Sequence, residues 1–158
     1  MEVATREPSG TLDVGLDVVV SGVASDAHTW NLVFLQLVLE ELGHRVTNLG
    51  ACVPDETLLA ECRRLRPALL VLSSVNGHGT TDGCRVARLL RDDPACAGLP
   101  MVIGGKLGIG GADGSSAAPL LDAGFDAVFE DGVGLSSFRS FVRSVESGRA
   151  AVPAGVAR

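Results

Sequence analysis

The sequence is poor in aromatic residues, with five phenylalanines, one tryptophan and no tyrosine among 158 residues. Because apolar residues still make up 46% of the chain, we expect an ordered core built from Val, Leu, Ile and Ala. Basic runs are also missing, and the net charge is −6, which argues against nucleic acid or an anionic membrane as a partner. No apolar stretch is long enough to span a bilayer.

The cysteines show no close pair and no metal-finger spacing; they are Cys52, Cys62, Cys84 and Cys96. This pattern is typical of reduced thiols and does not favour a structural zinc site. The N-terminal residues are polar and charged, without the apolar core of a signal peptide. We therefore expect a cytoplasmic protein.

The length of the chain suits one folded domain. We predict a disordered leader over 1–13, a folded domain over 14–147 and a flexible tail over 148–158. The leader contains Pro8 and Gly10, which break regular structure.

Five strand-like apolar segments alternate with five helix-like segments. The predicted strands cover 16–23, 45–50, 68–73, 99–103 and 126–129. The predicted helices cover 30–42, 54–66, 81–92, 115–123 and 135–147. This alternation predicts an α/β fold, a flavodoxin-like doubly wound five-stranded parallel sheet with helices on both faces. The simplest strand order is 2-1-3-4-5.

Polar or glycine-containing loops follow the first, third and fourth predicted strands, at 25–31, 73–79 and 104–111. In this strand order the three strands are neighbours, so the loops lie at one edge of the sheet. Ligands of open parallel sheets bind at that edge, outside the carboxyl ends of the strands. We therefore expect the binding site there.

The loop after the first strand places Asp26 two residues before His28. This pair suits a metal-ligating imidazole, in which one ring nitrogen faces the metal and the other donates its proton to the carboxylate. The sequence also allows a simpler interpretation, in which Asp26 caps the following helix and His28 is an exposed loop residue. The other histidines are ambiguous: His44 is expected at a helix-terminal surface, and His78 either lines the site or lies in a mobile loop.

The loops lack the motifs of several other classes. There is no phosphate loop ending in Gly-Lys-Ser/Thr and no Gly-x-Gly-x-x-Gly after the first strand. Ser73 stands where a phosphorelay receiver would carry its phosphorylatable aspartate. A Cys-His hydrolase is unsupported, because Cys52 is the only cysteine at a strand exit and no partner for it is indicated.

Taken together, the three loops resemble those of a known family. They read Asp-x-His after the first strand, Ser-Ser-x-x-Gly-x-Gly after the third and Gly-Gly-x-x-Gly after the fourth. This combination resembles the cobalamin-binding domain of adenosylcobalamin-dependent mutases and methionine synthase. It is most similar to the sigma (S) small subunit of glutamate mutase, also called methylaspartate mutase, over about 16–145.

The resemblance implies a cofactor, adenosylcobalamin, and a metal ligand, His28, as the lower axial ligand of cobalt. Asp26 would hydrogen-bond the imidazole, and the displaced nucleotide tail would enter a pocket beside the sheet. The implied cofactor-binding residues are Ser25, Asp26, Ala27, His28, Thr29, Asn31, Ser73, Ser74, Val75, Gly77, Gly104, Gly105, Lys106 and Leu107. Small residues there would let the backbone approach the tail, and exposed amides could meet its phosphate.

The resemblance also implies an isomerase that is active only as a hetero-oligomer. A separate barrel-type large subunit would carry the substrate contacts, and the pair would interconvert L-glutamate and 3-methylaspartate by radical chemistry belonging to the cofactor. The apolar edge around Trp30 and Val75 would dock that subunit. Three other functions stay open: a non-catalytic cobalamin carrier or accessory protein, a corrinoid methyltransferase shuttle, and a flavodoxin-like protein without cofactor.

Two positions depart from the family pattern. The family motif is Asp-x-His-x-x-Gly, and Asn31 stands in the place of its glycine. An asparagine there would either clash with the tail or add a hydrogen bond to it. The fifth strand usually exits into Gly-Thr, but here Glu130 and Asp131 follow it, which places two acidic residues near the expected tail pocket.

Overall fold

The computed structural model describes residues 15–110, 114–131 and 134–150, with side chains as far as residue 148. The predicted leader and most of the predicted tail lie outside these ranges. The strands are β1 (Asp17–Gly22), β2 (Arg45–Asn48), β3 (Leu69–Ser74), β4 (Met101–Gly105) and β5 (Ala127–Glu130). The helices are α1 (Trp30–Glu41), α2 (Asp55–Leu65), α3 (Gly79–Asp92), α4 (Ala117–Ala123) and α5 (Leu135–Ala150).

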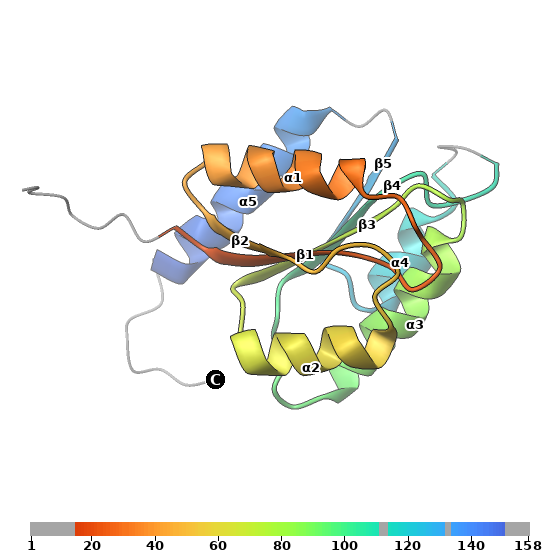
Figure 1. Cartoon of the computed structure of the whole chain (residues 1–158), viewed down its shortest axis with the longest axis horizontal. Helices are drawn as coiled ribbons and strands as arrows, with labels where there is room; N and C mark the ends of the chain where they lie inside the picture. Colours follow the sequence, from red (N-terminus) through yellow and green to blue (C-terminus); the bar gives the residue numbers. More distant parts are fainter. Residues whose placement is uncertain (1–14, 111–113, 132–133, 151–158) are drawn as a thin grey trace, which may run out of the picture.

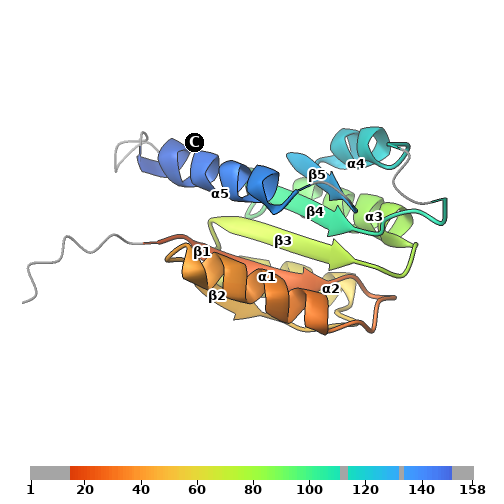
Figure 2. The same cartoon turned by 90° about the horizontal axis from the view of Figure 1, so that it is seen from above.

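The five strands form one parallel sheet in the order 2-1-3-4-5, which confirms the predicted fold. Helices α1 and α5 cover one face of the sheet, and α2, α3 and α4 cover the other (Figure 1). Figure 2 shows the strands running side by side, with their carboxyl ends toward the loops that follow β1, β3 and β4. None of the helices within the described residues is long and apolar enough to cross a membrane.

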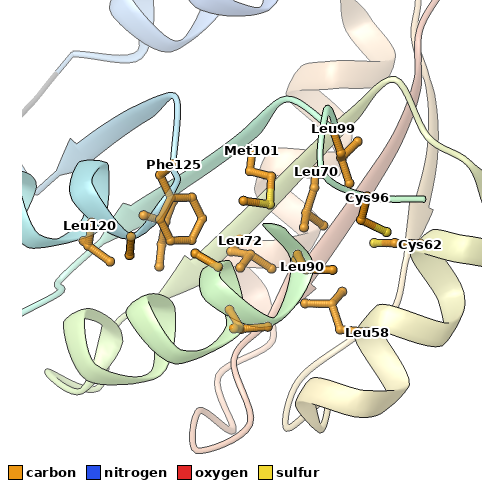
Figure 3. Close-up of a cluster of buried hydrophobic side chains, with 14 of the residues drawn as sticks. Leu58, Cys62, Leu70, Leu72, Leu90, Cys96, Leu99, Met101, Leu120 and Phe125 are labelled. Atoms are coloured by element: carbon orange, nitrogen blue, oxygen red, sulfur yellow. The ribbon is translucent and has the colours of Figure 1, made fainter. Parts of the chain in front are cut away.

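The face under α2, α3 and α4 is a continuous apolar cluster (Figure 3). Leu72 and Ile103 of the sheet and Leu90 of α3 are completely buried in it. The buried residues Leu58 of α2 and Phe125, which follows α4, extend the cluster across the layer. This apolar layer holds α2, α3 and α4 against one face of the sheet.

The register of the sheet sets the residues at its carboxyl edge. Gly22 pairs with Ser73, Ser73 with Gly104, and Gly104 with Phe129, so these residues form one row across four strands. A Cβ on Gly104 would lie 2.9 Å from the carbonyl oxygen of Phe129. The neighbouring strand therefore demands this glycine, whatever binds above it.

The structure corrects two expectations and extends a third. His44 is buried, 5% exposed, because its Nδ1 accepts a hydrogen bond from the Leu16 amide at 3.1 Å; the predicted surface position was wrong. The apolar spacing of 30–42 predicts a buried stripe that includes Val33 and Leu37, but on α1 these two residues are 50% and 59% exposed because they lie on the outer side of the helix. Helix α5 continues to residue 150 rather than 147.

Candidate functional site

Asp26 and His28 lie in the loop between β1 and α1 and contact each other directly. The Asp26 Oδ1 atom is 2.7 Å from His28 Nδ1 and accepts the backbone N–H of His28 at 3.0 Å. The other carboxylate oxygen accepts the backbone N–H of Val75, from the loop after β3, at 2.6 Å. The carboxylate is 1% exposed, whereas the imidazole is 53% exposed. A buried anion thus orients a half-exposed ring.

The electrostatics of this pair favour one protonation pattern. Burial raises the pKa of Asp26, but hydrogen bonds from the His28 and Val75 amides and from the His28 ring lower it, and the net result lies below its usual value. Asp26 is therefore an ionised acceptor at neutral pH. A neutral imidazole then carries its proton on Nδ1 and leaves the lone pair of Nε2 directed away from the carboxylate. That is the arrangement of an imidazole prepared to bind a metal.

A second hydrogen-bond network connects the same loop to α3 and to the loop after β3. The Ser25 hydroxyl donates to the Asp82 carboxylate of α3. The Asn76 side-chain amide donates to the Ser25 carbonyl at 3.0 Å. Asp82 in turn accepts Arg85 at 2.8 Å. These contacts join the loops after β1 and β3 through side chains, as their convergence at the sheet edge predicts.

A cavity of about 300 Å³ lies next to this pair, between α1, α5 and the carboxyl ends of β3, β4 and β5. Ligand pockets in proteins start at about this size. Trp30, Asn31, Phe34, Leu35, Val71, Leu72, Ser73, Val75, Val102, Ile103, Gly104, Gly105, Phe129, Glu130, Asp131, Gly134, Leu135 and Phe138 line it. Val75 connects the two features, because its amide bonds Asp26 and the residue lines the cavity.

Asn31 projects from the first turn of α1 and is only 9% exposed. Its Nδ2 donates to the Ser73 hydroxyl at 2.6 Å, which ties α1 to β3 in the cavity wall. Within the described part of the chain, its Oδ1 is buried and has no hydrogen-bond partner, and the same is true of Glu130 Oε1 at the end of β5. Unpaired buried oxygens are rare in folded proteins and call for an explanation.

The structure brings part of the predicted cofactor-binding set together. Asn31, Ser73, Val75, Gly104 and Gly105 all line the cavity. The two acidic residues expected near the tail pocket, Glu130 and Asp131, also line it. Ser25, Asp26, Ala27, His28 and Thr29 lie in the loop beside it rather than in its wall.

The remaining predicted residues are not among those lining the cavity. Ser74 alternates with Ser73 along β3, is fully buried, and donates to the Asn76 side chain at 3.1 Å. Leu107 is buried in the cluster of the α2, α3 and α4 face. Lys106 is exposed, and Gly77 contributes a backbone turn with φ of +87°. His78, the exposed residue before α3, also lies outside the cavity lining.

The backbone itself requires glycine at position 105. Its φ is +111°, and a Cβ there would overlap the carbonyl oxygen of Ser74. Only glycine tolerates both conditions. The two glycines that end β4, Gly104 and Gly105, are thus required by the sheet itself, whatever occupies the cavity that they line.

Sequence reasoning missed the wall that α5 contributes, Leu135 and Phe138. Three of the five phenylalanines, Phe34, Phe129 and Phe138, line this cavity. Phe129 and Phe138 pack edge to face with ring centroids 5.7 Å apart. In a chain with so few aromatics, their recurrence near the fifth strand was the available signal.

His28 is a single candidate ligand, since the described residues contain no group of three His, Cys, Asp or Glu side chains that could hold a metal ion. One imidazole suits a metal whose other ligands come with a larger organic group. The cavity supplies room for such a group, and its lining includes the polar residues Asn31, Ser73 and Glu130. The residues present therefore fit a metal cofactor with an appended arm.

Comparison with known sequences also indicates a cofactor-binding domain. The B12 binding domain family matches residues 16–134. The glutamate mutase sigma subunit of Halobacterium salinarum is 33% identical over 131 residues, 80% of this chain and 85% of that protein. The sigma subunit of Treponema denticola is 27% identical over 118 residues, 74% of this chain and 84% of that protein. The HTH-type transcriptional repressor CarA of Myxococcus xanthus is 36% identical over 83 residues, 52% of this chain and 28% of that protein.

Solved structures show the same fold at lower identity. A cobalamin-binding protein from Desulfitobacterium hafniense superposes with a TM-score of 0.62 at 18% identity, covering 87% of this chain and 59% of that one. A receiver domain of a histidine kinase from Syntrophus aciditrophicus superposes with a TM-score of 0.66 at 15% identity, covering 90% and 98%. At these identities the structures establish the fold alone, and the receiver match shows that the fold serves several functions.

Proposed function

We propose that this chain, which belongs to the B12-binding domain family, binds cobalamin with His28 as the lower axial ligand of cobalt. One observation carries the proposal: a buried carboxylate, Asp26, fixes the His28 ring so that Nε2 is available, directly beside a cavity. In this proposal the imidazole replaces the cofactor's own base, and the displaced nucleotide tail enters the cavity. Asn31, Ser73 and the aromatic side chains would hold the tail.

The chain's own residues would bind and orient the cofactor. Asp26 holds the Nδ1 proton and raises the basicity of the ring, while the Val75 amide keeps the carboxylate in place. The apolar walls exclude water from the tail. When bound in its adenosyl form, the cofactor supplies a cobalt–carbon bond that breaks to give radicals. We also propose a cytoplasmic location, because the cysteines are free thiols.

The finer proposal is that the chain is the small subunit of an adenosylcobalamin-dependent mutase of the glutamate mutase kind. The relation to sigma subunits over most of their length supports it. Such a subunit is active only with a large barrel-type subunit, and the expected reaction is interconversion of L-glutamate and 3-methylaspartate. Mixing the chain with such a subunit, adenosylcobalamin and glutamate tests this directly, since formation of 3-methylaspartate requires both proteins.

The second candidate is a cobalamin-binding carrier or accessory protein without mutase activity. Two observations favour it: Asn31 replaces the glycine of the family motif, and the sequence similarity extends to a transcriptional repressor. Cofactor binding without turnover, with any glutamate mutase large subunit tested, would support this alternative.

Cobalamin binding is tested by titrating hydroxocobalamin with the purified chain and recording its visible spectrum. We expect the spectrum to change to the base-off, imidazole-ligated form with the wild-type chain and not with His28→Ala. His78→Ala is the matched control, because His78 is also exposed and lies on the neighbouring loop. An unchanged wild-type spectrum, or an identical change with His28→Ala, would refute the proposed ligand.

The large subunit is expected to dock on the apolar edge around Trp30 and Val75. Trp30 is 71% exposed there, beside the exposed residues Val33 and Leu37. Trp30→Ala should weaken assembly while the free energy of unfolding changes by less than about 0.5 kcal/mol, as is usual for exposed sites. Sedimentation of the mixed subunits measures assembly; unchanged assembly with retained cofactor binding would contradict this surface.

A further inference from the structure

Two cysteine thiols that lie far apart in the sequence meet in the apolar cluster under α2, α3 and α4. Cys62 of α2 is 2% exposed, and Cys96, in the turn at 93–99 between α3 and β4, is 1% exposed. Figure 3 shows their sulfur atoms pointing toward one another from these two segments. Burial raises the pKa of the Cys62 thiol to about 12, and the neighbouring Cys96 contributes to that rise. The two thiols are therefore close enough to act on each other.

An ion pair beside the thiols holds the same two segments together. Arg63, the neighbour of Cys62 in α2, donates from Nε to the Asp93 carboxylate at 2.8 Å. The Asp93 carbonyl in turn accepts the backbone N–H of Cys96 at 3.0 Å. Hydrogen bonds next to both cysteines thus fix the position of the 93–99 turn against α2.

Only the thin 93–99 turn covers Cys96 on its outer side. Its neighbours Pro94, Ala95 and Ala97 are exposed, whereas Cys96 and Leu99 are buried beneath them. A surface turn of this kind opens at a lower free energy than the whole domain. A small reagent can therefore reach both thiols without global unfolding.

We propose that Cys62 and Cys96 form a redox-active dithiol that a two-electron oxidant of the hydroperoxide class converts into a disulfide. In a compartment that keeps thiols reduced, such a disulfide is transient and responds to exposure to the oxidant. Cys96 is the thiol that reacts first. Burial and Asp93 raise its pKa, but the guanidinium groups of Arg63 and Arg91 act against that rise.

The reaction with hydrogen peroxide consumes both thiols and one peroxide. The Cys96 sulfur attacks one peroxide oxygen, the O–O bond breaks, and the departing hydroxide takes the thiol proton and leaves as water. Cys96 is then a sulfenic acid. The Cys62 sulfur attacks the sulfenic sulfur, the S–O bond breaks, and a second water leaves with the Cys62 proton. The two sulfur atoms are oxidised to a disulfide and the peroxide is reduced to two waters.

The dithiol is separate from the candidate cofactor site. Cys62 lies near the end of α2, shortly before β3 begins, and Cys96 lies shortly before β4 begins. Both are thus at the amino edge of the parallel sheet, whereas Asp26 and His28 follow the carboxyl end of β1. The disulfide would join α2 covalently to the 93–99 turn. This inference therefore stands whether or not the chain binds cobalamin.

The test uses the full chain with Cys52→Ser, which removes the exposed thiol that would otherwise join two chains. After treatment with hydrogen peroxide, we expect the intact mass to fall by two hydrogen atoms, and peptide mapping without reductant to find Cys62 joined to Cys96. The midpoint of thermal unfolding should rise by about 5–10 °C, because the cross-link restricts the unfolded chain. Dithiothreitol should reverse both changes.

Two variants in the same background complete the test, each compared with its own reduced form. Cys84→Ala is the matched control, because Cys84 is also buried but its sulfur lies against the Pro119 carbonyl at 3.5 Å; it should keep the mass loss and the thermal shift. Cys96→Ala should abolish both. Oxygen added to the thiols without a cross-link, a disulfide that involves Cys84, or a mass unchanged after prolonged treatment would overturn the proposal.

Discussion

Apolar side chains cover both faces of the sheet, but within the described residues only the face under α1 and α5 has a cavity at the carboxyl ends of β3, β4 and β5. Under α2, α3 and α4, apolar side chains such as Leu72, Leu90 and Phe125 form one continuous buried cluster. Under α1 and α5, buried side chains fill the amino-terminal half of the sheet, while a cavity remains at the carboxyl ends of β3, β4 and β5. The cavity face also carries the unpaired oxygens of Asn31 and Glu130.

This difference separates residues that stabilise the fold from residues that are kept for a ligand. Under α2, α3 and α4 the apolar groups form one continuous cluster, as expected where residues serve stability alone. The face under α1 and α5 departs from that packing at the carboxyl ends of β3, β4 and β5, and the loop that carries Asp26 and His28 lies beside them. Departures of this kind are expected at functional sites, where packing gives way to binding.

The largest effect should come from truncating the packed face. Leu90→Ala removes a fully buried side chain from α3, so the free energy of unfolding should fall by about 2–5 kcal/mol. Leu35→Ala, at the cavity wall, should cost less, about 1 kcal/mol, because this half-buried side chain already borders empty space. Urea unfolding of both variants measures the difference; equal losses would show that the two faces are packed alike.

An intermediate loss of stability is expected at Asp82 of α3, which accepts a hydrogen bond from Ser25 in the loop after β1. Burial raises the pKa of Asp82, but hydrogen bonds from Ser25 and Arg85 lower it, and the net pKa is below its usual value. Because the folded-state pKa is the lower one, the stabilisation is fully present above about pH 4, the unfolded value. It is lost as pH falls through the folded-state pKa.

Asp82→Asn should therefore lower the free energy of unfolding at neutral pH by about 1 kcal/mol, a value discounted for the half-exposed Arg85. The gap between wild type and variant should close as the pH falls through the lowered folded-state pKa of Asp82. Urea unfolding across this range measures it. A gap that stays constant with pH would show that the ionised carboxylate contributes nothing. Asp55→Asn is a control, since Asp55 also pairs with Arg85 but does not contact the Ser25 loop.

The smallest expected effect is at the cavity, where a substitution should raise the free energy of unfolding rather than lower it. Asn31→Leu removes an unpaired buried oxygen and places apolar atoms at the cavity, at the cost of the hydrogen bond to Ser73. We expect the free energy of unfolding without ligand to rise by about 0.5–1 kcal/mol. Thermal unfolding of the ligand-free chain measures this. A loss of stability would mean that Asn31 is a structural residue rather than one kept for binding.

The fold followed from the sequence because five apolar segments alternate with five helix-like ones, and the parallel strand order leaves little freedom. The convergence of the Asp26–His28 loop with the loop after β3 also followed, because it depends only on that order. Three features did not follow. The burial of His44 depends on an amide of a distant residue, Leu16, and the wall formed by α5 depends on how that helix lies across the sheet.

The third is the role of Asn31. The sequence left two outcomes for its side chain, a clash with the tail or an added hydrogen bond. The structure shows that its Nδ2 donates to the Ser73 hydroxyl, 42 residues away along the chain. The hydrogen bond fixes the amide and leaves Oδ1 without a donor, and only three-dimensional contacts give that result.

The central claim, that a nitrogen of His28 binds cobalt, is tested most directly by electron paramagnetic resonance of the cobalt(II) form. The chain is prepared with histidine labelled with the heavy nitrogen isotope, and the added cobalamin is unlabelled. A protein imidazole on cobalt should convert the nitrogen triplet on each cobalt line into a doublet, and His78→Ala should behave identically. A triplet that persists would show that the cofactor's own base stays bound to cobalt, and the proposed ligand would be wrong.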